Sequence, residues 1–293
     1  MAKVIPTYDI CTIKPERNSS NELLVNRFAP YLKVHSGLCA AHRHNFYHLI
    51  YFTKGSGTHN IDFVNFPVSA GEIYFMSPGQ VHSWNFKSEP DGYVINFSEN
   101  FFRSFLANPT YLDQFTFFLG DAQQCVVFLP LAAQKKVKDL FDKILAAANN
   151  TKTTNPDLIK LWMLELFIIT ADQTKLPNTA NKQHGNHVVI SSFKKLIEEK
   201  YLQLHMPRDY AALLFVTPNY LNNLCKQVVG KPAGEFIRDR VLLEAKRMLV
   251  NQDMHISEIA HHLSFTDHSH FSKFFKKATG QAPETFRKSI MNH

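Results

Sequence analysis

The sequence predicts an α+β fold, in which an N-terminal antiparallel β-barrel with a helical segment precedes a C-terminal all-α domain. From about residue 28 to 100, short runs rich in Phe, Tyr, Val and Ile alternate with Gly and Pro, as in antiparallel barrels. Helical periodicity takes over from about residue 131, and a polar stretch before residue 188 is typical of a flexible linker. We place the parts at residues 1–130 (barrel), 131–175 (helical segment), 176–187 (linker) and 188–293 (all-α domain).

Histidines are concentrated in two strand-like segments of the barrel. Residues 42–57 read HRHNFYHLIYFTKGSG, and on a strand the even-numbered side chains share one face. Three histidines lie on that face: His42, His44 and His48. Residues 71–84 read GEIYFMSPGQVHSW and end in His82 and Trp84. Imidazoles that converge in one cavity can contact an organic ligand, bind a divalent transition metal, or serve as hydrogen-bonded core residues.

Two helices are expected after the barrel, over about residues 131–148 and 156–174. The first is amphipathic, and the second is apolar over most of its circumference although it contains Lys160 and Glu165. The second helix is too short and too interrupted by charge to span a bilayer. It must therefore be covered, either by the barrel or by the same helix of a second subunit.

The all-α domain contains a weak internal repeat. Residues 256–287 read ISEIAHHLSFTDHSHFSKFFKKATGQAPETFR and predict a short helix, a tight turn and a second helix that Thr266 or Asp267 can cap. Residues 209–238 follow the same pattern, with Thr217 as the cap and Pro218 as the first helical residue. Corresponding positions include Ala211 and Ala260, Leu221 and Phe271, Leu224 and Phe274, Lys226 and Lys276, and Gly230 and Gly280. A connecting helix between the copies should hold them at a fixed separation.

Each copy has the pattern of a helix-turn-helix, whose second helix enters the major groove of DNA. Polar and cationic side chains point outward from both second helices and suit phosphates and base edges. They are Asn219, Asn222, Asn223 and Lys226 in the first copy and His268, Ser269, Ser272, Lys273 and Lys276 in the second. A helical hairpin with a solvated basic face is the alternative, and the presence of two copies favours DNA binding.

Over about residues 188–290 the chain resembles the AraC/XylS family of bacterial transcription regulators. The positions that match the family motif are Ile256, Glu258 to Ala260, Phe265, Asp267, Phe271 to Lys273, Phe275 to Lys277, Gly280, Pro283, Phe286 and Arg287. Departures occur at Ser264, where the family usually has glycine, at the corresponding Phe215, and at His270. A positive φ at either turn residue would cost stability relative to glycine. The resemblance implies that the outward Asn, His and Ser residues and Lys273 read bases.

The two histidine segments look like the paired motifs of the cupin barrel, the usual sensory domain of this family. The resemblance puts His42 and His44 at the first two ligand positions, His48 at the glutamate position and His82 at the last histidine. Because the family's barrel more often binds an organic effector without metal, we expect a cupin-like effector pocket with no metal or other cofactor. Its expected contacts are His42, His44, His48, Lys54, His82 and Trp84.

The resemblance also implies a non-enzymatic homodimer that pairs through residues 156–174. Its expected partners are promoter half-sites in double-stranded DNA, a small-molecule effector and RNA polymerase, and activation is expected rather than repression. One rival is a metal-dependent cupin enzyme fused to a DNA-binding domain. Another is an effector-independent DNA-binding protein whose barrel only dimerises.

Charge and cysteine usage agree with a cytoplasmic DNA-binding protein. Residues 188–293 carry 15 Lys plus Arg against 10 Asp plus Glu, whereas residues 1–187 carry 17 against 15. The larger excess of positive charge in residues 188–293 favours nonspecific affinity of that part for DNA. The four cysteines are dispersed with no CxxC, as in reduced cytosolic proteins, and the N-terminal MAKVIPTYDICTIK lacks the apolar core of a signal peptide. We expect no membrane partner.

Overall fold

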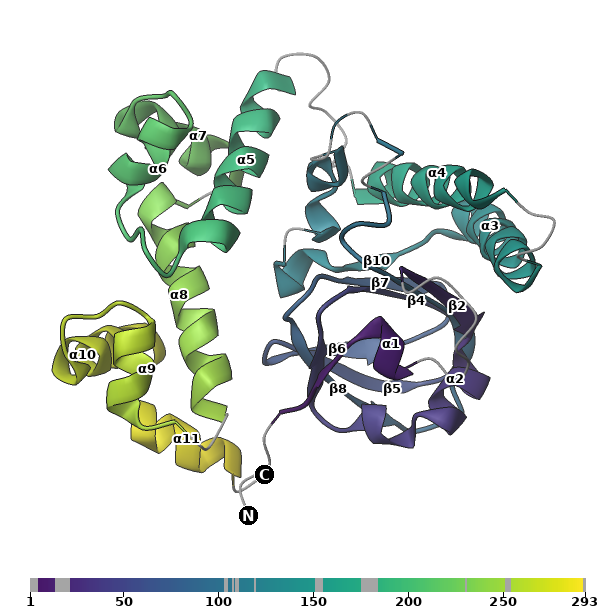
Figure 1. The fold of residues 1–293 in the computed structure, drawn as a ribbon, viewed down its shortest axis with the longest axis horizontal. Coiled ribbons are helices and arrows are strands. Elements are labelled where there is room, and N and C mark those ends of the chain that lie inside the picture. The colour runs from purple at the N-terminus through teal and green to yellow at the C-terminus, as the bar shows by residue number, and fades with distance from the viewer. Residues whose placement is uncertain are drawn as a thin grey trace. The chain divides into compact units, whose positions relative to one another are not determined.

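The computed structural model describes residues 5–13, 22–102, 105–106, 108, 111–118, 120–150, 155–174, 184–229, 231–250 and 254–291. The chain divides into two compact units (Figure 1). The N-terminal unit comprises Pro6–Asn178, and the helical unit is formed by Thr179–His293 with the first five residues of the chain.

Two five-stranded sheets form the centre of the N-terminal unit. The first contains, in spatial order, β1 (Thr7–Tyr8), β3 (His42–His44), β8 (Val81–Phe86), β5 (Gly57–Ile61) and β6 (Val64–Val68). The second contains β10 (Val126–Phe128), β7 (Glu72–Met76), β4 (Tyr47–Lys54), β9 (Asp91–Phe97) and β2 (Leu23–Arg27). The strands pair antiparallel except for β1 with β3, which are parallel. The expected cupin-like antiparallel fold is thus present. Within the described residues it is two sheets rather than a barrel closed by hydrogen bonds.

The first histidine segment is divided between the two sheets. The sequence predicted one continuous strand, but the chain bends at Asn45 and Phe46, so β3 belongs to the first sheet and β4 to the second. The even-numbered residues still enter one common core, because both strands direct this set toward the space between the sheets. That core also receives α1 (Ile10–Ile13) and α2 (Phe28–Val34) through their buried apolar residues. Short 3-10 helices occur at Ser36–Cys39, Tyr111–Gln114, Thr116–Phe118 and Ala122–Gln124.

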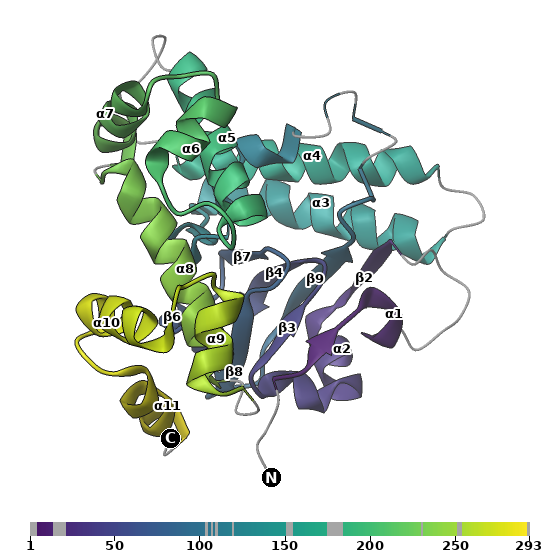
Figure 2. The same cartoon turned by 60° about the vertical axis from the view of Figure 1, so that its left-hand side comes forward.

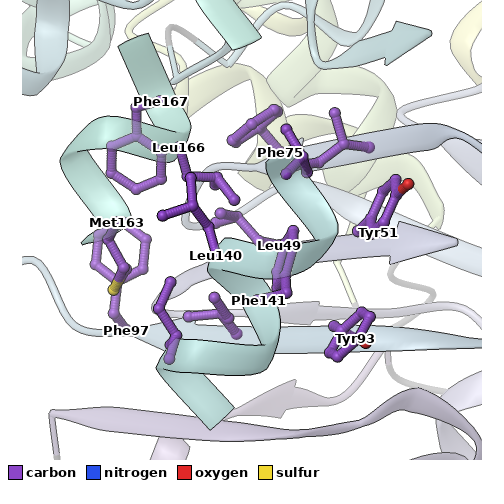
Figure 3. Packing of buried hydrophobic residues seen from close by; sticks show 14 of the residues in the cluster. Leu49, Tyr51, Phe75, Tyr93, Phe97, Leu140, Phe141, Met163, Leu166 and Phe167 are labelled. Atoms are coloured by element: carbon purple, nitrogen blue, oxygen red, sulfur yellow. The ribbon is translucent and has the colours of Figure 1, made fainter. Parts of the chain in front are cut away.

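A second core joins the outer face of the second sheet to two helices, α3 (Leu131–Asn149) and α4 (Pro156–Thr174). Figure 3 shows this packing, with labelled side chains from the sheet facing labelled side chains from the helices. The sheet contributes Leu49, Tyr51, Phe75, Tyr93 and Phe97, and the helices contribute Leu140, Phe141, Met163, Leu166 and Phe167. Leu49 and Tyr51 alternate with the interior residues of β4, so this strand is buried on both faces.

The apolar helix α4 is covered on one side only. Its buried residues pack against α3 and the sheet, which agrees with the first alternative from the sequence, that the helix is covered within its own subunit. Its outer side leaves a stripe of large apolar side chains in solvent, namely Leu158, Leu161 and Ile168. Their spacing of three and seven residues puts them on one helical face. No described helix of the chain has both the length and the hydropathy to cross a membrane.

The helical unit consists of seven helices in its described residues (Figure 2). They are α5 (His184–Lys200), α6 (Pro207–Leu213), α7 (Pro218–Val229), α8 (Ala233–Val250), α9 (Ile256–His262), α10 (His268–Thr279) and α11 (Pro283–Met291). Because α5 begins at His184, the last four residues of the predicted linker are helical, and residues 176–183 lie outside the described part of the chain. The long helix α8 is the predicted connector. One end packs in the core of α5, α6 and α7, and the other in the core of α9 and α10.

An ion-pair cluster fixes α8 against α5. Arg240 donates through Nε to Glu198 of α5 at 2.6 Å and through Nη1 to Glu244 one turn along α8 at 3.0 Å. Its guanidinium also lies 3.8 Å from the ring centroid of Tyr201. Only 12% of the Arg240 side chain is exposed, so these contacts act where solvent screening is reduced. The connector is therefore anchored at its middle as well as at its two ends.

Candidate nucleic-acid interface and histidine cluster

The two helix-turn-helix units, α6–α7 and α9–α10, have the same turn. Phe215 and Ser264 both adopt a positive φ, 54° and 57°, so the left-handed turn expected for glycine is formed without it. The hydrogen bonds also correspond, since the N–H of Val216 donates to Ala211 and that of Phe265 donates to Ala260. The repeat seen in the sequence is thus a repeat of backbone geometry.

The second helix of each unit is capped as the sequence predicts. Thr217 Oγ1 accepts from the N–H of Tyr220 at 3.1 Å before α7, and Asp267 accepts from the N–H of His270 at 2.8 Å before α10. This hydrogen bond to the charged carboxylate lowers the pKa of Asp267. On the first helix of the second unit, the Glu258 carboxylate accepts from the N–H of His255. These caps fix where α7 and α10 begin.

Most of the predicted DNA-contacting residues are exposed on α7 and α10. The exposed ones are Asn219, Asn223, Lys226, His268, Ser269, Lys273 and Lys276. Ser272 is half-buried. Beside them, Tyr220 presents its ring to solvent from the first turn of α7, a position that the sequence reasoning did not consider. Each outward face thus offers hydrogen-bonding groups and cations together, the combination that suits base edges and phosphates.

Asn222 differs from its neighbours because its side chain has an internal partner. It is half-buried, and its Oδ1 accepts from the N–H of Ala233, the first residue of α8, at 3.2 Å. This contact ties α7 to the connector α8. Asn222 therefore has a structural role that the sequence reasoning missed, since the partner lies eleven residues away in a different helix.

Five buried histidines gather between the two sheets of the N-terminal unit. They are His42, His44, His48, His59 and His82. Strand register explains the cluster, because His42 lies directly opposite His82 in the β3–β8 ladder. The ring centroids of these two residues are 4.2 Å apart, and the ring of His44 lies within 5 Å of both. His48 joins from β4 in the other sheet, with its centroid 4.8 Å from that of His44.

His59 was missed by the sequence reasoning. It lies on β5 opposite Trp84 of β8, and its Nε2 is 3.0 Å from Nδ1 of His82. The pattern of residues 57–61, in which His59 and Ile61 share a face, was the available signal. No local feature of the sequence predicts that β5 pairs with β8, so His59 could not be assigned to the cluster.

The histidines are neutral at neutral pH. Burial lowers the pKa of each ring below its usual value, and it brings the pKa of His48 to about 3. The neighbouring imidazoles lower the pKa of His44, His59 and His82 further. A neutral imidazole keeps a lone pair on one nitrogen, so the cluster offers both acceptors and donors.

Four of the six predicted effector contacts are the clustered histidines, Trp84 lies beside them, and Lys54 lies apart. Trp84 is buried, stacks on His59 and contacts the apolar residues Phe28 and Phe52. Lys54 is exposed at the far end of β4, six residues from His48, which is about 20 Å along a strand. The histidines thus form one candidate site without Lys54.

Comparisons with known proteins cover both units. A family described as AraC-like ligand binding domain matches residues 35–167, and one described as helix-turn-helix domain matches residues 210–289. The arabinose operon regulatory protein of Salmonella typhimurium is 23% identical over 80% of this chain and 80% of its own length.

Other matches cover the proteins less evenly. The transcriptional regulatory protein YesN of Bacillus subtilis is 37% identical over 110 residues, which is 36% of this chain and 29% of YesN. A crystal structure of ToxT from Vibrio cholerae is 14% identical, with a TM-score of 0.42 over 93% of this chain and 97% of that chain. With an AraC-like ligand binding domain followed by a helix-turn-helix domain, the chain belongs to the AraC family of transcriptional regulators.

Proposed function

We propose that this protein regulates transcription by reading promoter DNA with α7 and α10, under the control of an effector bound in the N-terminal unit. The observation that carries the proposal is the duplicated helix-turn-helix, with two capped helices that expose polar and cationic residues. By family resemblance we further propose an activator that works with RNA polymerase, acts in the cytoplasm and has no catalytic role.

The connector supports simultaneous reading by both units. A rigid α8, held by Arg240 and by a core at each end, keeps the two second helices at a fixed separation. Successive major-groove segments on one face of straight B-DNA are about 34 Å apart, and a shorter separation would require the DNA to bend. Two sequence elements spaced by one helical turn are therefore expected in each half-site.

Selection from a random-sequence DNA library with the full chain, at physiological salt, tests this proposal. The wild type should enrich a motif with two elements. Asn223→Ala should relax base preference in one element and Lys273→Ala in the other, each at a cost of about 1–3 kcal/mol for a lost base contact. Lys135→Ala removes an exposed cation from α3 and serves as the charge-matched control. Binding without any enriched motif would refute sequence-specific recognition.

A uniform loss of affinity in one of these variants would change only the role assigned to the substituted residue. If Lys273→Ala weakened binding to all sequences alike and made the salt dependence shallower, Lys273 would be a phosphate contact. Base reading by α10 would then have to come from its other exposed residues, of which Ser269 is the first to test.

We also propose that the exposed stripe of α4 pairs two subunits. Leu158, Leu161 and Ile168 are 40%, 51% and 45% exposed, and an apolar face of this kind is what a two-fold helical interface buries. Leu161→Glu should convert the protein to monomers in sedimentation experiments. Val34→Glu changes an apolar residue of the same unit that is even more exposed, at 65%, and should leave the assembly unchanged. A dimer that survives Leu161→Glu would exclude this face.

An effector changes DNA binding only if it binds two arrangements of the protein with different affinity. The clustered histidines support the N-terminal unit as its site, because they are the largest group of polar side chains in the buried set between the sheets. A screen of the full chain for thermal stabilisation by metabolites, followed by DNA-binding titrations with each hit, tests this role. Hits that stabilise the fold without changing the DNA affinity would contradict it.

A further inference from the structure

Three of the buried histidines present their nitrogens to one point between the sheets. One ring nitrogen from each of His42, His44 and His82 lies within 4.8 Å of the corresponding atoms of the other two. All three residues are at most 3% exposed. Because two of them come from β3 and the third from the paired strand β8, the register of the ladder holds the set together.

Two nitrogens of this set have the separation of two ligands on one ion. The Nε2 atoms of His42 and His44 are 3.2 Å apart. Two nitrogens that each lie about 2.0–2.1 Å from a tetrahedral Zn²⁺ are about 3.3 Å from one another. The ligand nitrogen of His82 lies within 4.8 Å of the other two, so it must approach them by at most about 1.5 Å to reach the same tetrahedral spacing.

The outer nitrogens have the partners that orient a metal ligand. Nδ1 of His42 lies 2.7 Å from the carbonyl oxygen of Ala40, which can only accept, so the proton is on Nδ1 and the lone pair is on Nε2. Nδ1 of His48 makes the same kind of contact with Oδ1 of Asn96 at 2.5 Å. Metal-bound histidines usually donate their second N–H to a carbonyl or carboxylate in this way.

Other nitrogens of the cluster have no hydrogen-bond partner among the described protein groups. They are Nδ1 of His44, Nδ1 of His59 and Nε2 of His82. Buried polar atoms are normally paired, so unpaired nitrogens in one small cluster point to a ligand that supplies the missing interactions. His82 contributes one ring nitrogen to the three-histidine set, and Nε2 is its nitrogen without a protein partner, so an ion held by the set would supply the missing interaction.

We propose that His42, His44 and His82 bind one divalent transition-metal ion of the Zn²⁺, Co²⁺ or Ni²⁺ type, with His48 beside it as a further candidate ligand. Neutral imidazole nitrogens prefer these ions over Mg²⁺ and Ca²⁺, which require oxygen ligands. The proposal goes beyond the regulatory function above, and it departs from the metal-free pocket that the family resemblance implied.

His59 acts in this proposal as a positioning residue for His82. If Nδ1 of His82 carries the proton and donates to Nε2 of His59, then Nε2 of His82 keeps its lone pair for the ion. The ring of His59 is itself held by stacking on Trp84. His59→Ala should therefore weaken metal binding by about 10- to 100-fold, as loss of an outer partner does, while the visible spectrum of the bound cobalt keeps its shape.

The test is a titration of the full chain, stripped with chelator, with CoCl₂ and then ZnCl₂. We expect one equivalent of Co²⁺ to give visible d–d absorption, ZnCl₂ to displace it, and either ion to raise the unfolding temperature. MgCl₂ should do none of these. His82→Ala and His44→Ala should each weaken binding on the order of 100-fold or more, since they remove ligands.

Exposed histidines provide the control for adventitious binding. The double variant His261→Ala, His262→Ala changes surface residues of α9 and should bind Co²⁺ as the wild type does. Loss of binding in this variant, or failure of the folded wild type to bind Co²⁺ or Zn²⁺ stoichiometrically, would overturn the proposal. Because the wild-type titration decides the question even if a core variant does not fold, and because it involves no DNA, its outcome is separate from that of the DNA selection.

Discussion

Phe215→Gly should stabilise the helical unit. Phe215 has a φ of 54°, and a left-handed conformation costs a residue other than glycine about 1–2 kcal/mol. The ring is 97% exposed, so its removal loses little burial energy. Glycine also gives the unfolded chain more freedom, which offsets about 0.4–1 kcal/mol of the gain. We expect the free energy of unfolding to rise by about 0.5–1 kcal/mol.

Scanning calorimetry of the full chain measures this effect on the transition of the helical unit. A gain of that size should raise its unfolding temperature by about 2–6 °C. Phe215→Ala is the matched control, because alanine keeps the Cβ atom that causes the strain and should unfold close to the wild type. Ser264→Gly, at φ 57° in the second unit, should shift the transition in the same direction. A Phe215→Gly protein no more stable than Phe215→Ala would refute the strain argument.

Three further perturbations test other parts of the structure. Asn222→Ala should destabilise the helical unit by about 1 kcal/mol in urea denaturation, because Asn222 accepts from the first N–H of α8, whereas Asn223→Ala should not. Phe167→Ala should cost about 3–5 kcal/mol by the same assay, since its ring is fully buried, and a loss below 1 kcal/mol would contradict that packing. In chelator-treated protein, the N-terminal unit should lose stability below pH 6.5. Because the pKa of His48 is lowered to about 3 in the folded protein, the unfolded state takes up a proton first as the pH falls. This histidine alone therefore lowers the free energy of unfolding with a slope approaching about 1.4 kcal/mol per pH unit. A free energy of unfolding that stays constant from pH 7 to 5 would contradict this reasoning.

Helices were predicted well because their signals are local. Pro156 and the apolar spacing that follows place α4 over the predicted residues 156–174, and Asp267 and Gly280 bound α10 with a side-chain cap and a left-handed end. The N-terminal boundary of α5 was missed, since no capping residue before His184 marks it. The turns at Phe215 and Ser264 contain no glycine, so they were identified from the repeat and the family motif and not from a local signal.

The sheet was predicted less completely, because alternation assigns a residue to a face but does not say which strand that face meets. His42, His44 and His48 were correctly expected on one side, yet the bend at Asn45 puts them in two sheets. Asn96 lies directly across the β4–β9 ladder from His48, a pairing between residues 48 positions apart in the chain. A candidate ligand set could therefore be read from the sequence, but its outer partners, which distinguish a metal site from a filled core, depend on register. That is why the same histidines suggested an organic pocket from the sequence and suggest a metal centre from the structure.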